Sequence, residues 1–275
     1  YGFPGTFRLV RCRRCGLLYL APRPTPAAIG AYYPDLDYHA FQSQSGPRAA
    51  LRRRLLANQA RALLRGLGDA PAVIEIGPGT GDLLAELRSQ GAQVEGIEPN
   101  EAAAKMARGR DLRVQTGTLE SIPLSPNTCD LAVMRYAQEH VHSPRRALIA
   151  LRDALKPGGR VVIWVPNAAS WDAALFGDHW RGYDAPRHLY LFTPATLHAY
   201  AEAVGMRLAN VTCSAVPNDW AGSAANWLRA RGMPDRWAKR LGAESLAALA
   251  AWFPLSALAA FFRRSGRIRA TLIRP

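Results

Sequence analysis

The chain has 275 residues, a length that fits one large domain or one domain with additions. Hydrophobic residues make up 49% of the sequence and charged residues 20%, which excludes a disordered or collagen-like chain. The net charge of +14 lies at the two ends, because residues 1–70 carry +8, residues 71–213 carry −1 and residues 214–275 carry +7. Basic flanks that share a face would attract phosphates or an anionic membrane, although an arginine-rich composition also explains the excess.

The N-terminal 67 residues are expected to hold the remnant of a cysteine knuckle and two helices, at 27–33 and 48–67. Cys12 and Cys15 have zinc-knuckle spacing, but tetrahedral zinc needs four ligands, so zinc is not expected here and the metal content stays open. Four cysteines are too few for a disulfide framework and indicate a reducing cytoplasm. No charged segment precedes an apolar run at the N-terminus, so a signal peptide is not expected.

From residue 72 the pattern alternates between short β-branched apolar runs and helical stretches. Strands are predicted at 73–76, 94–97, 112–115, 131–134 and 161–165, with helices at 82–90, 101–108 and 144–155. This alternation is typical of a parallel sheet with crossover helices. A helix at 194–204 and strands at 206–213 and 268–273 complete an expected core of residues 68–213 plus 267–275.

Two insertions interrupt this core. Residues 167–193 are rich in aromatic residues and histidine and are expected to form a lid. Residues 214–266 are expected to form a basic, apolar helical insertion, because they are far longer than a hairpin loop. Within it, the uncharged stretch 245–262 is interrupted by Pro254 and is too short and weakly apolar for a confident transmembrane helix. Two interpretations stay open: a helical pair packed on this chain or on a homodimer partner, or a segment lying on a membrane with aromatic residues inserted.

A glycine turn carries the strongest functional signal. Residues 73–82 read Val-Ile-Glu-Ile-Gly-Pro-Gly-Thr-Gly-Asp, which is a buried strand, a glycine turn and a helix start. Asp82 replaces the third glycine of a dinucleotide fingerprint, which argues against NAD, and the lack of Gly-Lys-Ser/Thr excludes a P-loop. The next strand ends at Glu98, where a carboxylate can accept both ribose hydroxyls of an adenosine ligand.

These residues, with the stretches at 117–123, 127–131, 138–141 and 155–160, resemble the class I S-adenosylmethionine-dependent methyltransferases, in their ubiquinone-biosynthesis-like branch. The resemblance implies a Rossmann-like α/β fold, with seven strands, one of them antiparallel, and helices on both faces. It implies S-adenosylmethionine as cofactor and S-adenosylhomocysteine as product. It also implies that the methionine, ribose and adenine are bound by Glu75, Gly77, Pro78, Gly79, Gly81, Glu98, Pro99, Thr118, Leu119 and Arg135.

The acceptor is expected beyond the fourth and fifth strands. Residues 183–190 resemble the Asp-x-Pro-Arg-His-Leu segment of related bacterial enzymes that are commonly encoded with cell-surface polysaccharide genes. Histidine is the natural base near neutral pH, so His188 and His140 are the candidate catalytic bases, with a structural role as the alternative for each. Substrate contacts are expected from Glu139, Trp180, Tyr183, Arg187 and Tyr190.

The predicted activity is O-methylation, with C- or N-methylation as alternatives, of a small molecule or of a glycan or lipid-linked cell-envelope intermediate. The enzyme is expected in the cytoplasm, with an anionic inner membrane face as a candidate partner. One alternative is an RNA methyltransferase, but no Asn/Asp-Pro-Pro-Tyr/Phe stretch follows the fourth strand, so no specific nucleic-acid partner is expected. The other alternative is a non-catalytic cofactor-binding or membrane-scaffold protein.

Overall fold

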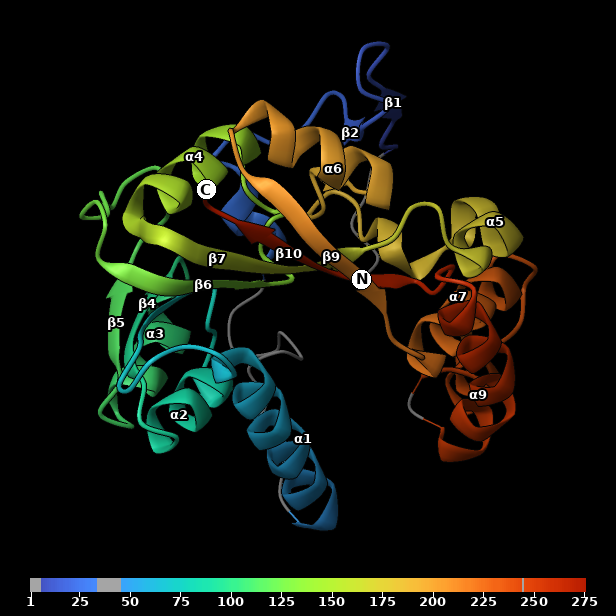
Figure 1. Ribbon diagram of the computed structural model, residues 1–275. Helices are drawn as coiled ribbons and strands as arrows, with labels where there is room; N and C mark the ends of the chain where they lie inside the picture. The colour runs from blue at the N-terminus through green and yellow to red at the C-terminus, as the bar shows by residue number, and fades with distance from the viewer. Residues whose placement is uncertain (1–5, 34–45, 244) are drawn as a thin grey trace.

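A seven-stranded sheet forms the centre of the protein (Figure 1). The computed structural model describes residues 6–33, 46–243 and 245–275. The strand order is β5–β4–β3–β6–β7–β10–β9, and β10 runs antiparallel to both neighbours while the other pairs are parallel. The expected Rossmann-like sheet with one antiparallel strand is therefore confirmed. Its strands are β3 (Ala72–Ile76), β4 (Gln93–Glu98), β5 (Arg113–Thr116), β6 (Cys129–Arg135), β7 (Leu155–Pro166), β9 (Arg207–Cys213) and β10 (Arg267–Ile273).

Helices cover both faces of this sheet (Figure 1). Successive strand residues point to opposite faces, so Leu131 and Val133 enter one apolar core while Ala132 and Met134 enter the other. The first core is closed by α1 (Gly46–Leu64), α2 (Asp82–Ser89) and α3 (Glu101–Arg108), and the second by α4 (Pro144–Ala154) and α6 (Pro194–Ala203). Burial on both faces explains why the central strands are continuous apolar runs.

The N-terminal segment forms a small ribbon that joins the expected lid. Strands β1 (Leu9–Arg11) and β2 (Leu18–Leu20) pair antiparallel, and β8 (Tyr190–Leu191) adds to β2. Cys12 and Cys15 lie in the turn between β1 and β2 as free thiols, and hydrogen bonding to Cys15 lowers the pKa of Cys12. The helix expected at 27–33 is instead a short 3₁₀ turn, η1 (Ile29–Tyr32), in a segment where prolines limit regular structure.

The two insertions pack against each other around aromatic side chains. Helix α5 (Trp171–Phe176) lies on α7 (Pro217–Arg229), and α8 (Asp235–Leu241) and α9 (Leu246–Phe261) complete the cluster. Phe176, Trp220 and Trp252 meet with ring centroids 5.6–6.2 Å apart. The expected interruption at Pro254 is wrong, because α9 continues through it as one helix. A proline removes a single intrahelical hydrogen bond, and packing here outweighs that loss.

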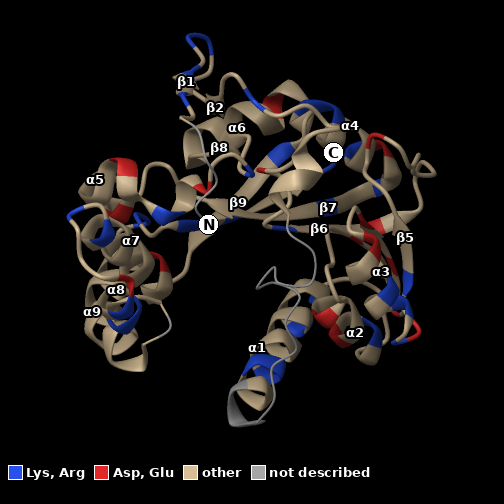
Figure 2. Ribbon diagram, turned by 180° about the vertical axis from the view of Figure 1, so that it is seen from behind, with Lys and Arg blue, Asp and Glu red and all other residues tan. Residues whose placement is uncertain are grey.

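Several large apolar side chains of α8 and α9 face outward. On α9 the side chains of Phe253, Leu258 and Phe261 are exposed, and that of Phe261 is 80% exposed. Among the described residues, no single helix is long and apolar enough to cross a membrane; α8 and α9 satisfy that test only together, across a bend of 52°. Basic residues gather on α8 and α1 (Figure 2), and both figures show α1 and the α7–α9 helices extending from the same side of the sheet.

Candidate active site

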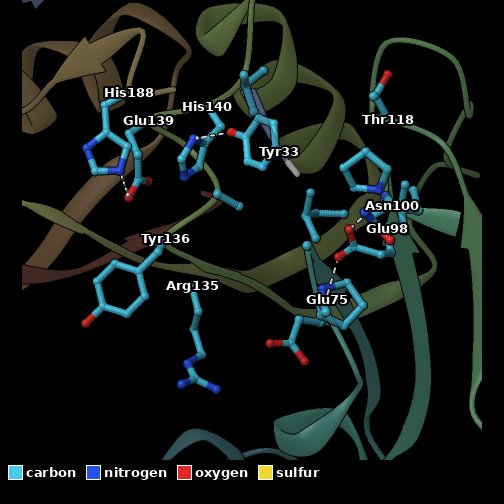
Figure 3. Close-up of a pocket in the computed structure, with 18 of the residues that line it drawn as sticks. Tyr33, Glu75, Glu98, Asn100, Thr118, Arg135, Tyr136, Glu139, His140 and His188 are labelled. Atoms are coloured by element: carbon cyan, nitrogen blue, oxygen red, sulfur yellow. Dashed lines mark hydrogen bonds and ion pairs between the residues drawn. The ribbon is translucent and has the colours of Figure 1, made fainter. Parts of the chain in front are cut away.

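A cavity of about 750 Å³ opens at the carboxyl ends of the parallel strands β3, β4 and β6. Ligands of open α/β sheets bind at this edge. Glu98 and Thr118 line one end of the cavity, and Glu139, His140 and His188 line the other (Figure 3). The residues expected to bind cofactor and those expected to act on the acceptor therefore share one cavity.

The turn from β3 to α2 requires glycine at its ends. Gly81 has φ +79° and forms the left-handed N-cap of α2, and a Cβ there would lie 2.4 Å from Cδ1 of Leu112. Gly77 has φ +70°, and a Cβ there would lie 3.2 Å from Cβ of Ala137. Only glycine satisfies both the backbone angle and the space at these positions. The turn thereby holds its backbone close to the cavity.

Glu98 ties this glycine turn to the next strand. Its Oε2 accepts a hydrogen bond from the N–H of Gly79 at 2.8 Å, and its Oε1 accepts one from the N–H of Asn100 at 2.9 Å. Burial raises the pKa of the Glu98 carboxyl, while the two N–H donors lower it. A carboxylate oxygen accepts more than one hydrogen bond, so Glu98 keeps acceptor capacity for a ribose diol.

Glu75 is a buried carboxylate on β3, two residues before Gly77 of the glycine turn. Its Oε2 has no hydrogen-bond partner among the described residues. Burial raises the pKa of Glu75 to about 7, and the nearby Arg135 opposes this shift. Both side chains extend toward the space between the two ends of the cavity (Figure 3). An orphaned buried acceptor suits a cationic donor, so the site fits the ammonium group of S-adenosylmethionine.

Nine of the ten residues expected to bind cofactor line the cavity, and Gly81 instead shapes the turn behind it. Thr118 is held by its neighbour Ser121, whose Oγ accepts the Thr118 N–H at 2.9 Å. Pro99 and Leu119 lie on the cavity wall beside it. The structure therefore brings these expected residues together at one end, where an adenosine group would lie.

At the other end, two segments bring Glu139 and the two histidines together. Glu139 and His140 follow β6, and His188 follows the 3₁₀ turn η4 (Arg181–Tyr183). The segments are joined because the carbonyl of Glu139 accepts the N–H of Leu189 at 2.8 Å. Nε2 of His188 lies 3.9 Å from Oε1 of Glu139, and the two imidazole rings meet edge to face with centroids 4.8 Å apart.

Hydrogen bonds engage Nδ1 of both histidines. Nδ1 of His188 lies 2.7 Å from the carbonyl oxygen of Gly182, which only accepts, so this Nδ1 carries the proton and Nε2 of His188 has a free lone pair. Nδ1 of His140 lies 2.7 Å from the hydroxyl of Tyr33 and 3.0 Å from the carbonyl oxygen of Arg187, so it is engaged in either tautomer (Figure 3). Burial lowers the pKa of His140 to about 3 and also lowers that of His188, so both rings are neutral near pH 7.

Four residues expected to contact substrate are not on the cavity wall. The Trp180 Nε1–H donates to Oδ2 of Asp172 at 2.8 Å, and its ring packs in the aromatic cluster of the insertions. Arg187 is buried and forms an ion pair with Asp184. The structure assigns packing and loop-holding contacts to these four side chains: Trp180, Tyr183, Arg187 and Tyr190.

Several polar residues on the cavity wall lie outside the sequence-based prediction, among them Tyr33, Tyr136, Asp219 and Arg267. Arg267 of β10 donates to both oxygens of Asp219 on α7 at 2.8 Å, and to the hydroxyl of Tyr136 at 3.1 Å. Tyr136 has φ +54°, a strained angle for a tyrosine of the kind that recurs at functional sites. Tyr136 directly follows the central strand β6, and this position could have identified it from the sequence as a candidate site residue. Asp219 and Arg267 come from distant segments and offer no local motif.

Comparisons with known proteins agree with this architecture. The family model described as "Methyltransferase domain" matches residues 48–211. The ubiquinone biosynthesis O-methyltransferase of Aeromonas salmonicida is 29% identical over 49% of this chain and 62% of its own length. An uncharacterized 37.1 kDa protein of Streptomyces fradiae is 33% identical over 38% of this chain and 32% of its own length. The matches thus span about a third to a half of the first curated relatives.

Solved structures share the fold at low sequence identity. A possible histamine N-methyltransferase of Thermotoga maritima has a TM-score of 0.54 at 19% identity, over 83% of this chain and 94% of that chain. The [4+2]-cyclase SpnF has a TM-score of 0.52 at 22% identity, over 86% of both chains. The fold alone therefore does not decide the reaction. The family model covers more than half of the sequence, and on that ground the chain belongs to the methyltransferase domain family.

Proposed function

We propose that the protein methylates an acceptor hydroxyl with S-adenosylmethionine as donor. The observation that carries the proposal is the shared cavity, with the Glu75 and Glu98 carboxylates at one end and two neutral imidazoles at the other. When bound, S-adenosylmethionine supplies an electrophilic methyl group and is released as S-adenosylhomocysteine. Glu75 would hold the methionine ammonium and Glu98 the ribose, while Thr118 and Leu119 border the adenine.

The acceptor end supplies orientation and proton acceptance. In-line placement of hydroxyl and methyl group accounts for much of the rate of such a transfer. The Nε2 lone pair of His188 is an available proton acceptor, because its Nδ1 already donates to the carbonyl of Gly182. His140 is the second candidate acceptor, with its Nδ1 held by Tyr33 and the carbonyl of Arg187. Relatives named as ubiquinone biosynthesis O-methyltransferases support oxygen as the methylated atom, whereas relatives named as ubiquinone/menaquinone biosynthesis C-methyltransferases support carbon as the alternative.

The acceptor proposed is a small molecule or a glycan or lipid-linked intermediate at an anionic membrane surface. The exposed phenylalanines of α9 support this class, because they would dip into the interface. Arg263 and Arg264 follow α9 directly, and their charges would meet anionic headgroups. The two alternative functions, RNA methylation and cofactor binding without turnover, predict different results in a labelling experiment.

The experiment uses methyl-labelled S-adenosylmethionine with fractionated host extract, and counts label in lipid, glycan, RNA and small-molecule pools. Label in the lipid, glycan or small-molecule pool supports the proposal. Label in RNA would replace the acceptor class, and no label despite confirmed cofactor binding would favour a non-catalytic protein.

Glu98→Ala tests the cofactor end of the same proposal. It removes the acceptor for Gly79 and Asn100 as well as for the ribose, so we expect a loss of S-adenosylmethionine affinity of at least about tenfold. Glu95→Ala is the matched control, because Glu95 lies on the same strand but is exposed to solvent. Calorimetric titration measures both variants, and equal affinities would overturn the assignment of Glu98.

A further inference from the structure

The carboxylate of Glu139 is buried without hydrogen-bond partners. Its side chain is 0% exposed, and neither Oε1 nor Oε2 has a partner among the described residues. Burial raises the pKa of Glu139 to about 8. A buried carboxyl with both oxygens unpaired destabilises the fold, because no hydrogen bond compensates for its loss of hydration. Such a group calls for a ligand that the chain itself does not supply.

The surroundings of Glu139 supply the other donors of a metal site. Glu139, His140 and His188 each offer one ligand atom, and these three atoms lie within 4.8 Å of one another. Figure 3 shows the three side chains turned toward a common space. Nδ1 of His188 donates to the carbonyl of Gly182 at 2.7 Å, and Nδ1 of His140 is held by the carbonyl of Arg187 at 3.0 Å and the hydroxyl of Tyr33 at 2.7 Å. This second hydrogen bond is the usual arrangement for metal-binding histidines, because it orients the ring and leaves Nε2 for the ion.

We propose that Glu139, His140 and His188 bind a divalent first-row transition metal through one carboxylate oxygen and two imidazole Nε2 atoms. Two nitrogens and one oxygen suit zinc, iron, cobalt or manganese, whereas magnesium and calcium prefer oxygen donors alone. Metal–ligand bonds of about 2.0–2.2 Å place neighbouring ligands roughly 3–3.5 Å apart, so the three side chains move inward by about 1 Å when the ion binds. The remaining coordination positions face the cavity.

The charges around the group are compatible with a cation. Asp184 lies beside the group, with its Oδ2 3.6 Å from Nε2 of His188, and the buried Arg187 pairs with Asp184. Arg267 is engaged by both oxygens of Asp219. Neutral imidazoles add no positive charge, so one ionised Glu139 and a divalent ion leave a modest net charge in the group.

The role of the ion in methyl transfer rests on the proposed function, whereas ion binding does not. A bound cation lowers the pKa of an oxygen ligand, so the acceptor hydroxyl would lose its proton to water rather than to an imidazole. The hydroxyl oxygen then bonds to the methyl carbon while the carbon–sulfur bond of the donor breaks. With the ion bound, both Nε2 lone pairs would be used, so this route would replace the proton acceptance by the imidazoles that the proposed function gives to the site without an ion.

Cobalt titration tests the site independently of activity. Chelator-treated protein is titrated with Co²⁺, followed by visible absorption and by calorimetry. We expect one Co²⁺ per chain, and a loss of affinity of at least about tenfold in Glu139→Gln and in His188→Gln. His198→Gln is the matched control, because His198 is an exposed histidine on α6. Unchanged S-adenosylmethionine affinity in every variant confirms that each has folded.

The outcomes separate the two proposals. Wild-type protein that binds no Co²⁺, or binds it equally in the Glu139 and His188 variants, overturns the metal site. Binding lost in Cys12→Ser and retained in Glu139→Gln would also overturn it, by moving the ion to the N-terminal thiols. Methyl transfer by protein shown by elemental analysis to be metal-free overturns the role of the ion in the transfer and keeps the enzyme. Stoichiometric Co²⁺ binding without methyl transfer keeps the site and overturns the proposed function.

Discussion

Glu75 and Glu98 are both buried carboxylates at strand ends, but they differ in their partners. Glu98 accepts two backbone N–H groups, whereas Oε2 of Glu75 has none and burial raises the pKa of Glu75 to about 7. Only ionised Glu75 attracts the methionine ammonium, so protonation below pH 7 opposes binding. We expect the dissociation constant for S-adenosylmethionine to rise about tenfold as the pH falls from 8 to 6, measured by calorimetric titration.

The variant Glu75→Gln removes the titrating group and should give weaker affinity that changes little over this pH range. The exposed Glu95→Gln, on the neighbouring strand β4, should keep the wild-type pH dependence. An affinity of the unsubstituted protein that does not change between pH 6 and 8 would contradict the role of Glu75.

The sequence predicted which residues lie together where one segment carries the whole signal. Gly77, Gly79 and Glu98 meet as expected, because a strand, its turn and the end of the next strand form a local unit. Prediction failed where a side chain is placed by a distant element. Trp180 points into the aromatic cluster because α7 and α9 pack there, and Asp219 reaches the cavity only because it pairs with Arg267 of β10.

At the scale of elements, the β3–α2 turn depends on how Gly81 fits between its neighbours. Gly81 and Gly91 both have positive φ, at +79° and +93°, but only Gly81 is crowded, with a Cβ 2.4 Å from Leu112. We expect Gly91→Ala to cost about 1 kcal/mol in free energy of unfolding, from backbone strain alone. Gly81→Ala should cost about 2–3 kcal/mol, because overpacking adds to that strain. Urea unfolding of the two variants measures the difference, and equal losses would refute the role of crowding.

The central strands were predictable to within a few residues because burial on both faces makes them apolar runs. Strand β7 is the exception, since it starts at Leu155 rather than 161. Residues after β10 continue the pairing toward the start of β7. The N–H of Gly158 donates to the carbonyl of Arg274 at 3.1 Å, and the N–H of Arg274 donates to the carbonyl of Gly159 at 2.9 Å. The pairing of β2 with β8 could not be predicted either. About 170 residues separate the two strands, and local hydrophobic periodicity contains no information on such a distant contact.

For the whole molecule, the two insertions act as one unit that also reaches the site. Helix α5 packs on α7, and Asp219 of α7 lines the cavity beside Arg267. The same unit presents the exposed apolar residues of α8 and α9 to the outside. A surface that binds a lipid interface would therefore be joined through α7 to the acceptor end of the cavity, which is the arrangement that a lipid-linked acceptor requires.

Membrane association can be measured by cosedimentation with vesicles. We expect binding to vesicles containing phosphatidylglycerol, weaker binding to pure phosphatidylcholine, and a decrease with added salt, because basic residues flank the apolar ones. Phe261 and Phe262 are 80% and 55% exposed, so Phe261→Ser with Phe262→Ser should lower partitioning at least about tenfold. Met106→Ser, at a 40% exposed residue of α3, is the matched control and should bind as the unsubstituted protein does. Equal binding to both vesicle types would contradict the role of the basic residues. No binding to either, with a dimer in light scattering that the phenylalanine variant converts to monomer, would assign this surface to protein contacts instead.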